Sequence, residues 1–282
     1  MNKRLAWAFL LILFTFSAAL SSSAEERPRG RWREKPSSYK EDDTVYATPT
    51  PPGPRIIGHI SLDPKKPEES VDVPKIQDVL SESELTALRT LQPNSASLPL
   101  EPLLQYPDLP TGCESVALTI ALKGLGFELG KATIASQYLV YSDDNFALGY
   151  VGDPFSDDGA GVFPPGLVRT ANSFLEAQGS SYKAYDASGV SFLDLLSFLA
   201  DGKPVILWVT MTYDDPMFSM DISDFEGRDY YWFWNEHCVA LKAYDKTAGT
   251  VTVEDPLEGE LTMELGTIEH LFKEIGYAVT IR

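Results

Sequence analysis

The chain is poor in the residue types that most often carry covalent chemistry, because its 282 residues include two cysteines and three histidines. Two cysteines allow one disulfide at most. The sequence also lacks an internal repeat and a glycine-rich phosphate loop, which argues against repeat architectures and phosphate-loop nucleotide binding. Beyond the first 20 residues no stretch is long and apolar enough to span a bilayer, and no cysteine lies just after this N-terminal segment, where a lipid could be attached.

The first 24 residues resemble an export signal. Two positive charges precede a 16-residue apolar run from Leu5 to Leu20, and Ser22 and Ala24 occupy the positions that a signal peptidase reads. The run is shorter than the roughly 20 residues of a permanent membrane helix. We therefore expect residues 1–24 to be a cleaved signal peptide and the mature protein to be secreted or held at the cell surface.

Composition divides the remainder into a linker and a domain. Residues 25–96 are rich in proline and charge, which predicts an extended linker, with one short helix near 81–91 that starts at a capping box of Ser81 and Glu84. Residues 97–282 are apolar, aromatic and punctuated by turns, as in one domain that buries roughly 70% of its unfolded surface. The composition therefore predicts a single domain that is large enough to be a catalytic domain.

Acidic residues are concentrated in that domain. Residues 97–282 contain 28 Asp and Glu against 10 Lys and Arg, whereas residues 1–96 contain 13 of each kind. Such a surface repels nucleic acid and attracts cationic peptides, although solubility alone also explains it. We expect a peptide or protein partner, including cationic or cell-wall peptides, and neither a nucleic-acid partner nor a stable membrane span.

Periodicity predicts an α+β fold of two packed layers. Helical spacing occurs after residue 111 and in three later segments, while β-branched and aromatic runs follow from residue 203 onward, with one more helix among them. Helices first and an antiparallel sheet later indicate a helical part packed on a C-terminal sheet.

Cys113 lies at the start of the first apolar helix of the domain, in the stretch DLPTGCESVAL. Thr111 and Glu114 fit a capping box that makes Cys113 the second helical residue. A thiol at a helix N-terminus ionises more easily than a free one, which favours a nucleophile. An inert core residue and one half of a disulfide with Cys238 are the alternatives.

The stretch WNEHCVALKAYDKTAGTVTVEDP, which begins at Trp234, predicts two strands joined by a short loop. Antiparallel pairing with His237 opposite Asp255 leaves a five-residue loop from Tyr244 to Ala248. Both side chains then point to one face, where the carboxylate can orient the imidazole and the imidazole can accept a thiol proton. A structural hydrogen bond between them is the simpler alternative.

Elimination also favours His237 as the catalytic imidazole. His59 lies in the linker, and His270 lies on a helix whose apolar face is formed by other residues. Strand alternation turns Cys238 to the face opposite His237, which argues against a disulfide between Cys113 and Cys238.

Three motifs, LLQYPDLPTGCESVAL, FWNEHCVALKAYD and VTVEDPLEG, together resemble the papain-like cysteine peptidases. The resemblance is closest to exported relatives of the bacterial double-glycine leader peptidases, which process bacteriocin precursors, and it spans residues 97–282. It implies a papain-like fold with the cysteine on the central helix, and catalytic roles for Cys113, His237, Asp255 and Gln105. The amide of Gln105 would help the Cys113 backbone N–H to bind the oxyanion, an interaction worth about 3 kcal/mol per donor.

Two features depart from the transporter-linked members of that family. No membrane spans or ATPase follow the domain, and Gly112 stands where an aspartate commonly precedes the cysteine, so cleavage after a double glycine is not implied. We expect an exported Cys-His-Asp peptidase that needs no cofactor or metal. The alternatives are a cell-wall endopeptidase, a transglutaminase-like acyl transferase, and a catalytically silent binding module.

Two further stretches have open interpretations. The acidic loop of residues 143–158 is either a calcium site or a solvated rim, and its spacing does not match the EF-hand loop. The aromatic run DYYWFW, residues 229–234, either lines a substrate groove or packs in the core.

Overall fold

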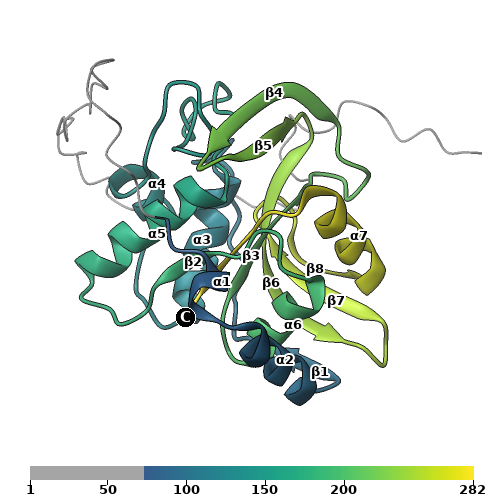
Figure 1. Cartoon of the computed structure of the whole chain (residues 1–282). Helices are drawn as coiled ribbons and strands as arrows, with labels where there is room; N and C mark the ends of the chain where they lie inside the picture. The colour runs from purple at the N-terminus through teal and green to yellow at the C-terminus, as the bar shows by residue number, and fades with distance from the viewer. Residues whose placement is uncertain (1–72) are drawn as a thin grey trace, which may run out of the picture. The chain divides into compact units, whose positions relative to one another are not determined.

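The computed structural model describes residues 73–282, which form an α+β fold around one large antiparallel sheet (Figure 1). Helices dominate the first half of this part and strands the second, as the periodicity predicts. The predicted signal peptide lies outside the described residues. None of the helices in residues 73–282 is long and apolar enough to cross a membrane.

The main sheet contains seven strands, and each of its strand pairs is antiparallel. The order is β2-β9-β3-β6-β7-β8, with β1 paired to one end of β6. The strands are β1 (Ser95–Ser97), β2 (Ala184–Asp186), β3 (Val205–Thr210), β6 (Glu236–Asp245), β7 (Thr250–Asp255), β8 (Gly259–Glu264) and β9 (Ala278–Ile281). A separate hairpin consists of β4 (Phe218–Phe225) and β5 (Arg228–Phe233).

Helices cover both faces of this sheet, so the prediction of two layers is wrong. The helices are α1 (Ile76–Val79), α2 (Glu82–Leu91), α3 (Cys113–Gly124), α4 (Thr133–Gln137), α5 (Pro164–Ala177), α6 (Phe192–Ala200) and α7 (Leu265–Ile275). One core cluster joins α3 and α5 to Trp208 and Cys238, and the other joins α6 and α7 to Val209 and Val239. The physical reason is that every residue of β3 is buried, so the strand needs an apolar partner on each side.

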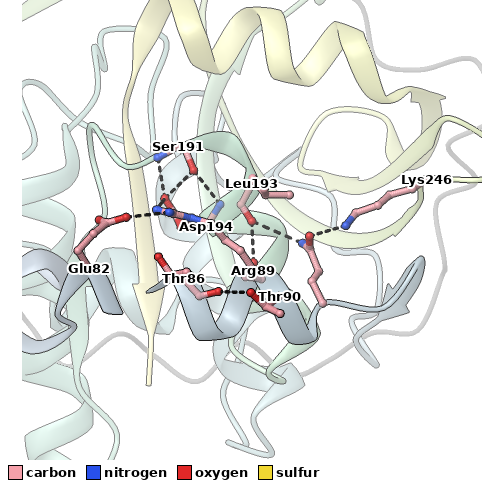
Figure 2. A network of polar contacts seen from close by, with 10 residues as sticks. Glu82, Thr86, Arg89, Thr90, Ser191, Leu193, Asp194 and Lys246 are labelled. Atoms are coloured by element: carbon pink, nitrogen blue, oxygen red, sulfur yellow. Dashed lines mark hydrogen bonds and ion pairs between the residues drawn. The ribbon is translucent and has the colours of Figure 1, made fainter. Parts of the chain in front are cut away.

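The predicted capping box at the start of α2 is confirmed, and the structure has a second one at the start of α6. Ser81 caps α2 in a capping box with Glu84, and Ser191 caps α6 in a capping box with Asp194. Arg89 of α2 also contacts the Asp194 carboxylate through two nitrogens, at 2.6 and 3.0 Å (Figure 2). This contact joins the two helices at their polar ends.

Residues 73–96 pack on the domain, so the predicted linker is wrong for this part. Ile76 is fully buried and Leu85 is 5% exposed, both in the core cluster that contains α6. Strand β1 adds to the sheet beside the far end of β6. These apolar side chains are widely spaced among charged ones, which explains why composition alone grouped them with the linker. Residues 25–72 of that prediction lie outside the described residues.

The hairpin of β6 and β7 exists, but its predicted register is wrong by two residues. Leu241 pairs with Val253, and an irregularity at Lys242 inserts one extra residue in β6, so that the loop has four residues, 246–249. A two-residue shift keeps each side chain on its original face. His237 and Asp255 therefore become diagonal neighbours that can still reach each other.

Candidate functional site

Cys113 is the first residue of α3, and Gly112 is its N-cap. The predicted capping box is wrong, because no side chain caps this helix. The Thr111 hydroxyl instead donates to the carbonyl oxygens of Asp153 and Ser156, at 3.2 and 2.9 Å. Contacts of Thr111 with the loop that contains Asp153 and Ser156 thus take the place of the helix cap that the sequence pattern predicts.

Two buried carboxylates lie beside the Cys113 thiol. The sulfur is 3.4 Å from Oε2 of Glu114 and 4.0 Å from Oε2 of Glu236. Glu114 is held in place because its Oε1 accepts a 2.7 Å hydrogen bond from the Val162 backbone N–H. Oε1 of Glu236 is buried and has no hydrogen-bond partner among the described residues. The thiol therefore lies in an acidic environment.

This environment reverses the expected effect of the helix N-terminus on the thiol. Burial, followed by the charges of Glu114 and Glu236, raises the pKa of Cys113 well above its ordinary value. Burial also raises the pKa of Glu114 to about 7, and burial together with Glu114 raises the pKa of Glu236. Near neutral pH the site therefore retains protons, and the resting Cys113 side chain is a thiol.

His237 and Asp255 form a buried pair at the start of β6 and the end of β7. Nε2 of the ring is 2.7 Å from Oδ1 of Asp255, and the two residues are 1% and 0% exposed. Asp255 accepts further hydrogen bonds from the Tyr213 hydroxyl at 2.6 Å and from the Leu257 N–H at 2.7 Å. The carboxylate is thereby fixed, and Nδ1 of His237 is left for another partner.

The hydrogen bonds explain the ionisation of Asp255. Burial alone would raise its pKa, but the charge and hydrogen bond of His237, with the contacts from Tyr213 and Leu257, lower the pKa below its ordinary value. The carboxylate stays ionised and can stabilise a protonated imidazole. This is the electrostatic role that a general base needs from its partner.

The sulfur and the imidazole come from neighbouring parts of the structure. The carboxylate of Glu236, the residue before His237, lies 4.0 Å from the sulfur, and a protonated His237 ring lowers the pKa of Glu114. Within residues 73–282, however, no hydrogen bond joins the sulfur to the ring. The structure thus pairs His237 with Asp255, while direct proton transfer from the Cys113 thiol to the His237 ring stays a prediction.

Gln105 lies between the segments that carry these residues. Its backbone N–H donates to the carbonyl oxygen of Pro256, next to Asp255, and its side-chain Nε2 donates to the carbonyl oxygen of Pro110 at 2.7 Å. The side chain is buried, and its Oε1 has no hydrogen-bond partner among the described residues. One N–H of the side-chain amide remains for an oxyanion.

Both cysteines are free and buried, which excludes the disulfide alternative. Cys113 is 6% exposed and Cys238 is fully buried in the same core cluster. Cys238 is therefore a core residue, and Cys113 is the more accessible thiol.

The structure bears on the two segments with open interpretations, the acidic loop of residues 143–158 and the aromatic run of residues 229–234. All five aspartates of the acidic loop are exposed, and none belongs to the single group of three potential ligands in residues 73–282, which is Cys113, Glu114 and Glu236. In the aromatic run Tyr230 and Phe233 are buried, whereas Tyr231 and Trp234 are exposed. The run is thus half core and half surface.

Three residues of this site were missed from the sequence. Glu114 and Glu236 are each adjacent to a predicted catalytic residue and interrupt apolar segments, a signal that marks a buried carboxylate. Tyr213 gave no such signal, because it lies in a loop after β3 with a positive φ of 59°. Only the tertiary fold brings its hydroxyl to Asp255.

Replacing Tyr213 by phenylalanine should destabilise the protein, because the substitution removes one donor from a buried carboxylate. A hydrogen bond to a charged group contributes about 1.5–3 kcal/mol, so we expect a loss of that size in the free energy of unfolding. Urea denaturation measures it. Tyr231→Phe, at an exposed tyrosine, is the control, and equal stability of Tyr213→Phe and wild type would contradict the assignment.

Stability should also depend on the proton held by Glu114. Its pKa is raised from 4.5 to about 7, so the folded protein keeps a proton that the unfolded chain loses, and this contribution to stability is lost as pH rises through that window. Glu114→Gln lacks this titration and should gain stability relative to wild type between pH 4.5 and 7. Urea denaturation at both pH values measures the difference. Glu128→Gln, at an exposed residue, should show none.

A buried thiol at the start of a helix, with a His–Asp pair on the adjoining sheet, is the arrangement that the resemblance to papain-like cysteine peptidases implies. Residues 97–278 match the model of the Peptidase_C39-like family. The match covers more than half of the chain, and the protein belongs to this family.

The chain is similar to proteins of known sequence or structure. The chain is 27% identical over 209 residues to YvpB of Bacillus subtilis (strain 168), a protein described as uncharacterized, and the alignment covers 67% of this chain and 80% of YvpB. The crystal structure of a protein from Bacillus anthracis assigned as a C39-like peptidase is similar, with 24% identity and a TM-score of 0.57 over 67% of this chain and 97% of that one. Xylellain, a cysteine protease from Xylella fastidiosa, is more distant, with 12% identity and a TM-score of 0.37 over 70% of this chain and 88% of its own.

Proposed function

We propose that the protein is an exported peptidase that hydrolyses a peptide amide bond through Cys113, His237 and Asp255. One observation carries the proposal most directly: the buried 2.7 Å His237–Asp255 pair begins one residue after Glu236, whose carboxylate lies beside the Cys113 sulfur. Membership of a peptidase family supports the proposal, and a thiol, an imidazole and a carboxylate are the groups that thiol catalysis uses as nucleophile, base and orienting partner.

The reaction follows from those three groups. The Cys113 sulfur attacks the carbonyl carbon while its proton passes to Nδ1 of His237, and Asp255 stabilises the resulting imidazolium. The imidazolium returns the proton to the leaving amine as the C–N bond breaks. Water, deprotonated by the same ring, then hydrolyses the thioester and frees the thiol.

The negatively charged oxygen of the tetrahedral intermediate needs two hydrogen-bond donors to stabilise it. The backbone N–H of Cys113 and the side-chain amide of Gln105 fill this role in our proposal, supported by the burial of Gln105 and its attachment to Pro110 and Pro256. Loss of one such donor typically lowers the rate by about 10²–10³.

The acidic surroundings of the thiol suit a nucleophile that is activated only during attack. The raised pKa keeps the proton on the Cys113 sulfur in the resting state. In our proposal the proton moves to the His237 ring only when bound substrate excludes water from the site. Protonated Glu114 and Glu236 would then carry no charge to oppose the thiolate. The proposed resting state of Cys113 is therefore a thiol.

Export and substrate choice extend this proposal. The N-terminal signal pattern supports a secreted or cell-surface location, and the acidic domain favours cationic peptides or cell-wall peptides as substrates. A peptide substrate is what the family implies.

Profiling a peptide library and isolated cell-wall fragments with the purified full chain tests the proposal. Mass spectrometry should detect new peptide termini, and prior treatment with iodoacetamide should prevent them. Acyl transfer to an added amine, without hydrolysis, would instead identify a transglutaminase-like enzyme. A protein that binds peptides and leaves them intact would be the catalytically silent module.

A further inference from the structure

We propose that Cys113, Glu114 and Glu236 form a binding site for a thiophilic divalent cation such as Zn²⁺. One ligand atom from each residue lies within 4.8 Å of the other two, and all three residues are buried. A thiolate and two carboxylate oxygens are ligands that Zn²⁺ accepts, and a three-residue set leaves a fourth position for water.

The distances fit a tetrahedral ion. With a Zn–S bond near 2.3 Å and Zn–O bonds near 2.1 Å, a tetrahedral site places sulfur and oxygen about 3.6 Å apart. The sulfur lies 3.4 Å from Oε2 of Glu114 and 4.0 Å from Oε2 of Glu236, on either side of that value. The two sulfur–oxygen separations are therefore compatible with one ion bound by all three residues.

A buried carboxylate oxygen of Glu236 without a hydrogen-bond partner is a second observation that points to a cation. Glu236 is 6% exposed, its Oε2 is directed at the sulfur, and its Oε1 has no hydrogen-bond partner among the described residues. In residues 73–282 no lysine or arginine forms an ion pair with Glu114 or Glu236. Buried carboxylates without a counter-charge are either protonated or bound to a cation.

Rigid support of Glu114 makes the site pre-organised. Its Oε1 accepts the Val162 N–H, which leaves Oε2 directed toward the sulfur. Gly161 approaches so closely that an added Cβ would lie 2.6 Å from Oε1, so the carboxylate has little freedom to turn away. Cation binding needs the thiolate, so it releases the thiol proton to solvent.

Occupation of this site would block the nucleophile. This inhibitory consequence rests on the proposed function, whereas the binding itself does not. A bound cation would occupy the sulfur lone pair that attacks the substrate, and removal of the cation by a chelator would restore it.

Co²⁺ added to the metal-free full chain tests the site without any substrate. We expect a sulfur-to-cobalt charge-transfer band with the visible bands of tetrahedral Co²⁺, and loss of both when Zn²⁺ is added. Cys113→Ser should lack the charge-transfer band, while Cys238→Ala and Glu128→Gln should keep it. These controls assign the band to Cys113 even if Co²⁺ also binds elsewhere in the chain.

Glutamine variants test the two carboxylates. Loss of residues that merely support a metal ligand costs 10–100-fold in affinity, so Glu114→Gln and Glu236→Gln should each weaken Co²⁺ binding by at least about tenfold. Absence of the band in the wild type, or wild-type affinity in both variants, would overturn the proposal. If one variant does not fold, the other and the wild-type spectrum decide. Peptide cleavage measured with a chelator present tests the proposed function separately.

Discussion

Replacing Cys113 by alanine is expected to abolish peptide cleavage. The thioester cannot form without the sulfur, and no other cysteine can take its place, because Cys238 is fully buried in the core. Loss of the nucleophile from a serine triad costs about 10⁶ in rate, so we expect a fall of at least about 10⁴-fold here. The rate of appearance of new peptide termini measures it.

Cys238→Ala is the matched control for this variant. It removes the same atoms from the same core cluster but leaves the candidate nucleophile in place. Circular dichroism should show both variants folded, and only the Cys113 variant should lose cleavage. Equal activity of the two variants would exclude covalent catalysis by Cys113.

Replacing His237 by alanine should lower the cleavage rate by about 10²–10⁴, the usual contribution of a positioned general base. The thiol depends strongly on this base, because burial and two carboxylates raise its pKa. Without the ring, proton removal must rely on water, which has little access to a residue that is 6% exposed.

The chain contains a second His–Asp pair that serves as the control. Nε2 of His270 is 2.7 Å from Oδ1 of Asp215, the same separation as in the buried pair, but both side chains are more than half exposed. His270→Ala should therefore leave cleavage unchanged. A similar loss in both histidine variants would indicate a general effect on folding, and no loss in His237→Ala would remove the ring from the mechanism.

Local patterns predicted the parts of the site that depend on short segments. Spacing within one helix or one hairpin predicts three of these features: the helix at Cys113, the capping box at Ser81, and the approach of His237 to Asp255. The His–Asp contact forms although the predicted register is wrong by two residues, because an even shift leaves each side chain on the same face of the sheet.

Features that depend on distant segments were not predictable in this way. Thr111 and Glu114 have the spacing of a capping box, but each has a stronger partner in the loop of residues 150–162. Helices on both faces of the sheet require knowledge of which strands are central, and Tyr213 reaches Asp255 only through the loop after β3. The raised pKa of Cys113 likewise arises first from burial in the tertiary fold, then from Glu114 and from Glu236, which is 123 positions away in sequence.

Alkylation by iodoacetamide, mapped to each cysteine by mass spectrometry with a chelator present, tests most directly whether His237 activates Cys113. Near neutral pH the His237 ring should accept the thiol proton as Cys113 attacks the reagent, so the wild type should be modified selectively at Cys113. His237→Ala should lose this selectivity, while His270→Ala keeps it. Slow and equal modification of Cys113 and Cys238, or a Cys113 rate that does not change in His237→Ala, would contradict the account.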